Sequence, residues 1–113
     1  MTTATALLTQ WIAHLRDERR FADNSVEAYE RDVAAFLGFL SGHLGGEPSV
    51  RDLAELEPRD LRAYLAYRRQ GLDALSDRSI SRALAAIRSF YRYLERRHGV
   101  ANARLALVRG PKL

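Results

Sequence analysis

The chain has 113 residues, of which 47% are apolar and none is cysteine, and its formal net charge is +4. These values are typical of one globular domain with a packed core, and they exclude a disordered chain, a disulfide framework and a thiolate metal site. The three histidines, His14, His43 and His98, have no ligand-like spacing, so no metal site is expected.

The charge is divided unevenly along the chain. Residues 1–58 carry ten acids and five arginines (net −5), whereas residues 59–113 carry thirteen basic residues and four acids (net +9). A basic half of this kind indicates a polyanionic partner, and arginine suits phosphate and guanine. No secretory signal and no run of about 18 apolar residues is present, so we expect a cytoplasmic protein with no membrane partner.

Two amphipathic helices are predicted in the N-terminal half. The first spans residues 3–20, and the second follows "ADNS", with Asn24 as its expected N-cap and Glu27 as the capping-box acid. Three glycines and a proline in "SGHLGGEPS", residues 41–49, predict a loop after it. The expected buried faces are Leu7, Leu8, Trp11, Ile12 and Leu15, and then Val26, Tyr29, Val33, Phe36, Leu37 and Leu40.

The next segments predict a short turn and a third helix. "VRDLAEL", residues 50–56, is expected to form a turn that docks on the bundle through its leucines. The third helix begins at Pro58, a residue suited to the first helical position, and stops near Gly71. Its candidate inward residues are Leu61, Tyr64, Leu65 and Tyr67.

"SDRSISRALAAIRSFYRYLERR", residues 76–97, predicts a fourth helix that begins at Ser76 or Asp77 and ends near His98 before Gly99. At about 100° per residue, one side is apolar and the opposite side combines arginines with small residues. The apolar side comprises Ile80, Leu84, Ile87, Tyr91 and Leu94, flanked by Ala83 and Phe90. The opposite stripe comprises Arg78, Arg82, Ala85, Ser89, Arg92 and Arg96, with Ser81 and Arg88 beside it.

No strand is predicted, and a short fifth helix is expected near residues 102–107. The fold class is therefore all-α, a small bundle of four main helices. Residues 1–108 are expected to form one domain, and residues 109–113 the start of a linker.

The arginine stripe favours a helix that lies against a nucleic-acid backbone or in a major groove. Small residues allow close approach, while arginines reach phosphates and base edges. Asn24 and Ser25, at the start of the second helix, are candidate phosphate contacts. We expect Arg82→Ala or Arg92→Ala to weaken binding without unfolding the bundle.

Two other interpretations remain open. Any amphipathic helix has a charged face, and arginines can pair with an acidic protein, so a helical protein-interaction module is the main alternative. A free-standing helix-turn-helix regulator requires a three- or four-residue turn, which the roughly six-residue link between the third and fourth helices fits poorly. The sequence has no phosphate loop, nucleophile elbow or paired histidines, so neither a self-sufficient enzyme nor a cofactor is expected.

Three segments resemble the tyrosine recombinase (phage integrase) family, most closely its Xer subgroup. They are "NSVEAYERDVAAFLGFL" (24–40), "LSDRSISRALAAIRSFYRYL" (75–94) and the linker-like "GPKL" (110–113). The resemblance covers nearly the whole chain and implies an N-terminal, SAM-like core-binding domain. Such a domain forms half of a clamp around one recombination half-site, with its second and fourth helices across the major groove.

The resemblance also implies partners and chemistry. The partners are double-stranded DNA and other recombinase protomers in a synaptic complex. DNA would be contacted by Arg78, Arg82, Ser89, Arg92 and Arg96, with Ser81, Arg88, Asn24 and Ser25 nearby. In this family a tyrosine of the C-terminal domain cleaves DNA through a 3′-phosphotyrosyl intermediate, without metal or nucleotide cofactor. No residue of this chain inherits a catalytic role, and the catalytic domain is expected to be absent.

Overall fold

The computed structural model describes residues 2–113, and its secondary structure confirms the all-α prediction. Within those residues the only β pairing is an isolated bridge between Thr3 and Ser49. Four main helices and two short ones follow one another along the chain. They are α1 (Ala4–Asp17), α2 (Asp23–Leu44), α3 (Val50–Glu55), α4 (Pro58–Arg68), α5 (Asp77–His98) and the 3₁₀ helix η1 (Ala103–Leu107).

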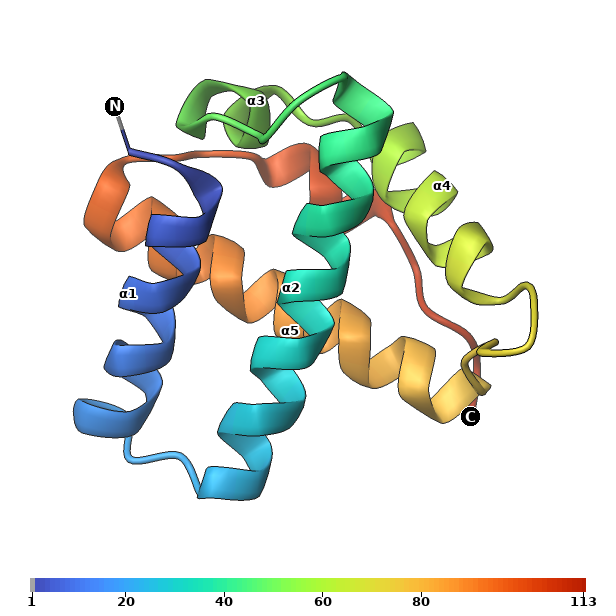
Figure 1. Ribbon diagram of the computed structural model, residues 1–113, viewed down its shortest axis with the longest axis horizontal. Helices are drawn as coiled ribbons and strands as arrows, with labels where there is room; N and C mark the ends of the chain where they lie inside the picture. Colours follow the sequence, from blue (N-terminus) through green and yellow to red (C-terminus); the bar gives the residue numbers. More distant parts are fainter. Residues whose placement is uncertain (1) are drawn as a thin grey trace.

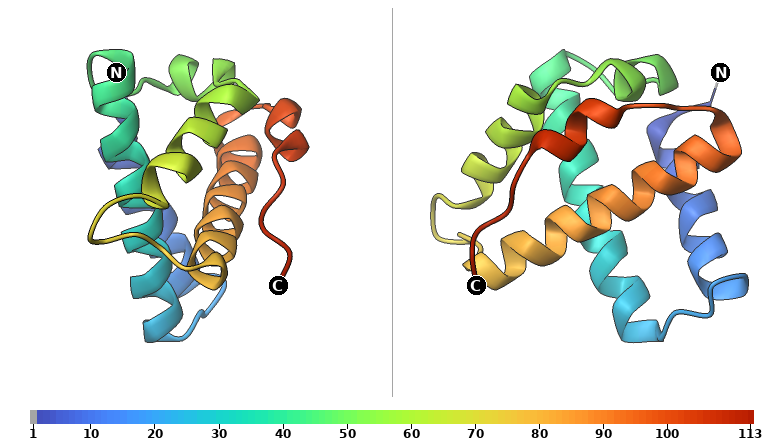
Figure 2. Two further views of the ribbon diagram at one scale, coloured as in Figure 1. Left: turned by 90° about the vertical axis from the view of Figure 1, so that its right-hand side faces the viewer. Right: turned by 180° about the vertical axis from the view of Figure 1, so that it is seen from behind.

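The two long helices cross, and the others pack around the crossing. Antiparallel α1 and α2 lie on one side of α5, and α4 flanks α2 (Figure 1). Seen from behind, α5 runs across both helices, with η1 and the C-terminal tail beside it (Figure 2). Aromatic side chains fill the centre: the rings of Trp11 and Phe90 lie 5.3 Å apart, as do those of Phe36 and Tyr64. This core fixes α5 with one side buried and the other outward.

Helix α2 begins earlier and ends later than predicted. Its N-cap is Ala22, which offers no side-chain hydrogen bond, so the predicted capping box of Asn24 and Glu27 is wrong. The helix continues to Leu44 and ends at Gly45, whose φ of +84° suits a glycine. The His43 ring stacks on Phe39 and contacts Asp60, and these contacts hold the last turn despite Gly42.

The segments after α2 show two further differences from the predictions. Residues 50–55 form a helix rather than a turn, because Ser49 and Asp52 make a reciprocal capping box. Pro58 begins α4 as predicted, and Leu61, Tyr64 and Leu65 are buried. Tyr67, however, is 59% exposed, although its ring lies 5.2 Å from that of Phe39.

The start and end of α5 match the prediction. The Ser76 hydroxyl accepts from the Ser79 amide, and Gly99 ends the helix with a φ of +66°. The predicted short fifth helix is η1. Within residues 2–113, no helix has the length and apolar character of a membrane span.

Asp60 links α4 to α2 and makes the fold sensitive to acid. Its burial opposes ionisation, but the Glu57 amide and the His43 ring together hold the pKa of the carboxyl below its ordinary value. The stabilisation is therefore present above about pH 4 and is lost as pH falls towards the folded-state pKa.

We expect Asp60→Asn to lower the free energy of unfolding by about 1 kcal/mol at pH 7, because the helix cap is weakened. In urea denaturation at pH 7 and pH 3, this difference should shrink at pH 3, whereas exposed Asp73→Asn should show none at either pH. An equal loss at both pH values would contradict the assignment.

Candidate nucleic-acid interface

The outward side of α5 carries a row of arginines separated by small residues. Arg78, Ala85, Arg92 and Arg96 are exposed, and Ser89 is half-buried among them. Ile80, Leu84, Ile87, Phe90 and Leu94 fill the opposite side, so the helix cannot rotate without exposing its core. We call Arg78, Ala85, Ser89, Arg92 and Arg96 the α5 stripe. In Figure 2 (right), α5 lies in front of α1 and α2, so that one of its sides is turned away from these two helices.

The arginines of the α5 stripe keep their charge uncompensated. Among residues 2–113, Arg78, Arg92 and Arg96 form no ion pair. The acid next to Arg78, Asp77, pairs instead with Arg69 at 2.8 Å. Three guanidinium groups without ion pairs on one helix face form a local positive field that attracts a polyanion.

Arg82 has a different environment from the stripe, although the sequence pattern grouped them. Its Nε and Nη2 atoms donate to the two carboxylate oxygens of Asp32 on α2, at 2.8 and 3.0 Å. Asp32 is 3% exposed and the Arg82 side chain 37%. The hydrogen bonds to Asp32 raise the pKa of Arg82, so the guanidinium stays charged. Arg82 therefore holds α2 against α5. Its removal is expected to affect the stability of the fold as well as the binding of any ligand.

The start of α2 meets Arg82 across a shallow hollow. Asn24 and Ser25 line this hollow together with Phe21, Ala28, Tyr29 and Arg82. Both Asn24 and Ser25 are exposed. Because no side chain caps α2 at Ala22, its first amides are free of a side-chain acceptor and point along the helix axis. The structure thus brings Asn24 and Ser25 close to Arg82, although neither serves as the cap.

Ser81 and Arg88 lie on the flank of α5 that the C-terminal tail covers. An Nη2 group of Arg88 donates to the carbonyl oxygen of buried Val108. A Cβ placed on Gly110 would lie 3.7 Å from the Ser81 hydroxyl and 3.4 Å from Leu84. These two predicted site residues therefore border the tail rather than the open stripe.

We expect Arg88→Ala to loosen the tail. Loss of a charge-assisted hydrogen bond costs about 1 kcal/mol or more, which corresponds to roughly five-fold faster local opening. Trypsin cleavage after Arg109, followed by mass spectrometry under native conditions, measures this opening. Arg92→Ala, at a position that makes no hydrogen bond to residues 108–113, should be cut at the wild-type rate. Equal rates for all three proteins would show that Arg88 does not hold the tail.

A second arginine cluster, which the sequence pattern did not reveal, lies beside the start of α5. Arg62 of α4, Arg69 directly after this helix and Arg109 of the tail line one hollow with Gly110 and Pro111. Arg109 is far in sequence from Arg62 and Arg69, and the docking of the tail against α4 and α5 brings it beside them. Arg62 and Arg109, which form no ion pair among residues 2–113, extend the positive surface from Arg78 towards α4.

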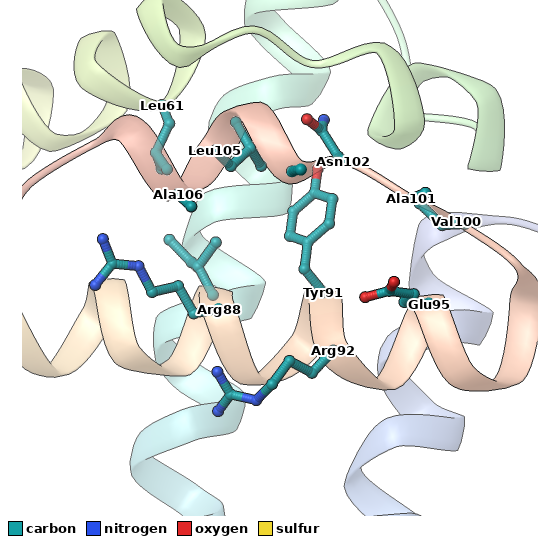
Figure 3. Close-up of a pocket in the computed structure, with 12 residues that line it drawn as sticks. Leu61, Arg88, Tyr91, Arg92, Glu95, Val100, Ala101, Asn102, Leu105 and Ala106 are labelled. Atoms are coloured by element: carbon teal, nitrogen blue, oxygen red, sulfur yellow. The ribbon is translucent and has the colours of Figure 1, made fainter.

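An apolar recess lies between α5 and η1 (Figure 3). It measures about 270 Å³, and Tyr91 projects into it from α5 towards Asn102. Burial raises the pKa of Tyr91, so its hydroxyl stays protonated and donates to the Leu53 carbonyl oxygen at 2.9 Å. Asn102 bridges the carbonyl oxygens of Leu53 and Leu56. These polar groups hold α3 and η1 together, and none is free to act as a nucleophile.

Residues 2–113 contain no group of three or more His, Asp or Glu side chains placed to hold a metal ion. Asp32 is a further residue of the interface that the sequence pattern did not reveal. The available signal was its place beside Val33, within the apolar pattern of α2, because an acid there requires a basic partner from another helix.

Comparison with known proteins agrees with this architecture. The family model described as "Phage integrase, N-terminal SAM-like domain" matches residues 8–98. Proteins named "Tyrosine recombinase XerC" are similar: that of Rhizobium meliloti is 51% identical over 104 residues, 91% of this chain and 32% of the relative. Those of Mesorhizobium japonicum and Methylobacterium nodulans are 48% and 50% identical over 90% and 91% of the chain. The chain spans about a third of the length of these relatives. No solved structure matches it significantly.

Proposed function

This chain belongs to the phage integrase N-terminal SAM-like family, and from that premise we propose that it binds duplex DNA through α5 and the start of α2. The observation that carries the proposal is the α5 stripe, with its three arginines free of ion pairs among residues 2–113. A core-fixed helix with an outward row of arginines and small residues fits a major groove, which admits one helix.

Each part of the interface has a separate role in this proposal. Arg78, Arg92 and Arg96 neutralise phosphates or reach base edges, and Ala85 and Ser89 permit close approach. Asn24 and Ser25 place the positive end of the α2 dipole against a phosphate. Arg82 contributes to the DNA contact at the junction of α2 and α5. Ser81 and Arg88 lie near the edge of the duplex, beside the tail.

The role in a whole recombinase is part of the same proposal. The domain holds one side of a recombination half-site, and residues 109–113 lead into a catalytic domain on the other side. The parent enzyme cuts and rejoins DNA through a 3′-phosphotyrosyl intermediate, in a complex with further protomers, as in chromosome-dimer resolution. The support is membership of the family and the identity to relatives named XerC.

The test is a fluorescence titration of the chain into a labelled duplex that carries a Xer-type half-site, and into a scrambled duplex, at two salt concentrations. The proposal predicts tighter binding to the half-site and a steep loss of affinity with salt, because phosphate contacts release counterions. Equal affinity for both duplexes would indicate only a sequence-independent attraction to the DNA backbone. Absence of binding at low salt would refute the proposal.

One observation favours a second candidate function, a protein-interaction module. The recess beside η1 is apolar and has Arg88 and Arg92 on its rim, and Leu107 nearby is 66% exposed. An acidic partner with an apolar anchor would fit that surface. Self-association without DNA, seen in sedimentation or sizing, would favour this function over DNA binding.

A further inference from the structure

Asp32 is the only charged side chain within residues 2–113 that is fully buried, and it faces Arg82 from the middle of α2. We infer that Asp32 is a positioning residue for DNA binding, which holds the Arg82 guanidinium at the hollow between α2 and α5 so that its unused N–H groups meet a phosphate. The inference rests on the proposed function and adds to it a residue that does not itself touch DNA.

The geometry of the pair fixes Arg82 in one orientation. Two parallel hydrogen bonds, of 2.8 and 3.0 Å, join the planar guanidinium to both oxygens of Asp32. A bidentate pair of this kind defines the plane as well as the position of the group. Guanidinium has five N–H donors, and this pair uses two of them. The donors of Nη1 and the second donor of Nη2 remain for a ligand.

Arg82 lies at the place where a phosphate is expected. Arg82 lines the hollow together with Asn24 and Ser25, and Phe21 and Tyr29 form its apolar wall. Asp32 lies seven residues, about two turns, after Ser25, and so on the same side of α2. Limited water access beside an apolar wall strengthens a contact between a guanidinium and an anion. Arg82, fixed beforehand, loses little side-chain freedom when such an anion binds.

Charge alone gives the opposite expectation for Asp32. A carboxylate beneath a surface that binds a polyanion repels that polyanion, so removing it should tighten binding and steepen the salt dependence. A positioning role predicts weaker binding after the same change, because the arginine becomes free to adopt other rotamers. The sign of the effect therefore separates the two accounts.

The first test is Asp32→Asn in the 113-residue chain, measured by titration into the half-site duplex at a temperature where circular dichroism shows the variant folded. Positioning predicts binding about three- to ten-fold weaker, although the net charge rises by one. Unchanged or tighter binding would overturn the inference.

Arg82→Lys tests the same idea if Asp32→Asn does not fold. This variant keeps the charge but loses the bidentate hydrogen bonding, and we expect a similar three- to ten-fold loss of affinity for the half-site duplex. The matched control is Arg51→Lys, at an exposed position of α3 outside the proposed interface, which should change affinity less than two-fold. Equal effects of the two lysine variants would overturn the inference. Failure of the wild-type chain to bind any duplex would instead refute the proposed function.

Discussion

Replacing Arg82 by alanine is expected to lower the free energy of unfolding by about 2–4 kcal/mol, and so to lower Tm by roughly 10 °C or more. The change leaves the Asp32 carboxylate, 3% exposed, without its partner. The cost lies below that of breaking a wholly buried pair, because the arginine is partly solvated. Urea or thermal denaturation followed by circular dichroism at pH 7 measures it. This expectation replaces the one drawn from the sequence, which was that Arg82→Ala does not unfold the bundle.

Two controls separate this effect from a general loss of charge. Arg92→Ala removes the same charge from the exposed stripe and should stay within about 0.5 kcal/mol of wild type. The paired change Asp32→Leu with Arg82→Met removes both charges and should recover most of the lost stability, because no unpaired charge remains buried. If Arg82→Ala were as stable as Arg92→Ala, the ion pair would not hold α2 to α5.

Removing the three free arginines of the α5 stripe should have the largest effect on DNA affinity. We expect Arg78→Ala, Arg92→Ala and Arg96→Ala together to weaken binding about 100-fold or more at 0.1 M salt, from about 1 kcal/mol or more per contact. The slope of log affinity against log salt should become shallower by about 2.7, since each phosphate contact contributes about 0.9. Fluorescence anisotropy at four salt concentrations provides both values.

A charge-matched variant serves as the control. Arg51, Arg59 and Arg104 are exposed arginines on α3, α4 and η1, away from the outward face of α5. Their replacement by alanine removes the same charge and should change the salt slope by less than one. Both triple variants should remain helical, because alanine suits exposed helix positions. Equal losses of affinity in the two would mean that net charge, and not the stripe, attracts DNA.

The sequence predicted α5 well because its local signals agree. Ser76, Gly99 and the 3.6-residue apolar period all indicate the same helix, and the outward position of Arg78, Arg92 and Arg96 follows from that period. The end of α2 was less predictable. Gly42 lies in a segment rich in loop-forming residues, and the contact that keeps it helical comes from Asp60, 17 residues away from His43.

The interface was only partly predictable for a similar reason. Helical period places Arg82 on the stripe and Arg88 beside it, but neither period nor composition shows what lies across from them. Asp32 is 50 residues from Arg82, and Val108 is 20 residues from Arg88. Such contacts depend on how α2 and the tail pack against α5, so they appear only once the tertiary structure is known.

The most direct test of the DNA-binding surface is a titration of the ¹⁵N-labelled chain with the half-site duplex, followed by two-dimensional NMR. We predict that the largest amide shifts fall on Arg78, Ala85, Ser89 and Arg92 of the stripe, together with Asn24 and Ser25. Shifts concentrated around Phe39 and Tyr67, on the outer side of α2 and α4, would contradict the account, as would the absence of shifts at saturating duplex.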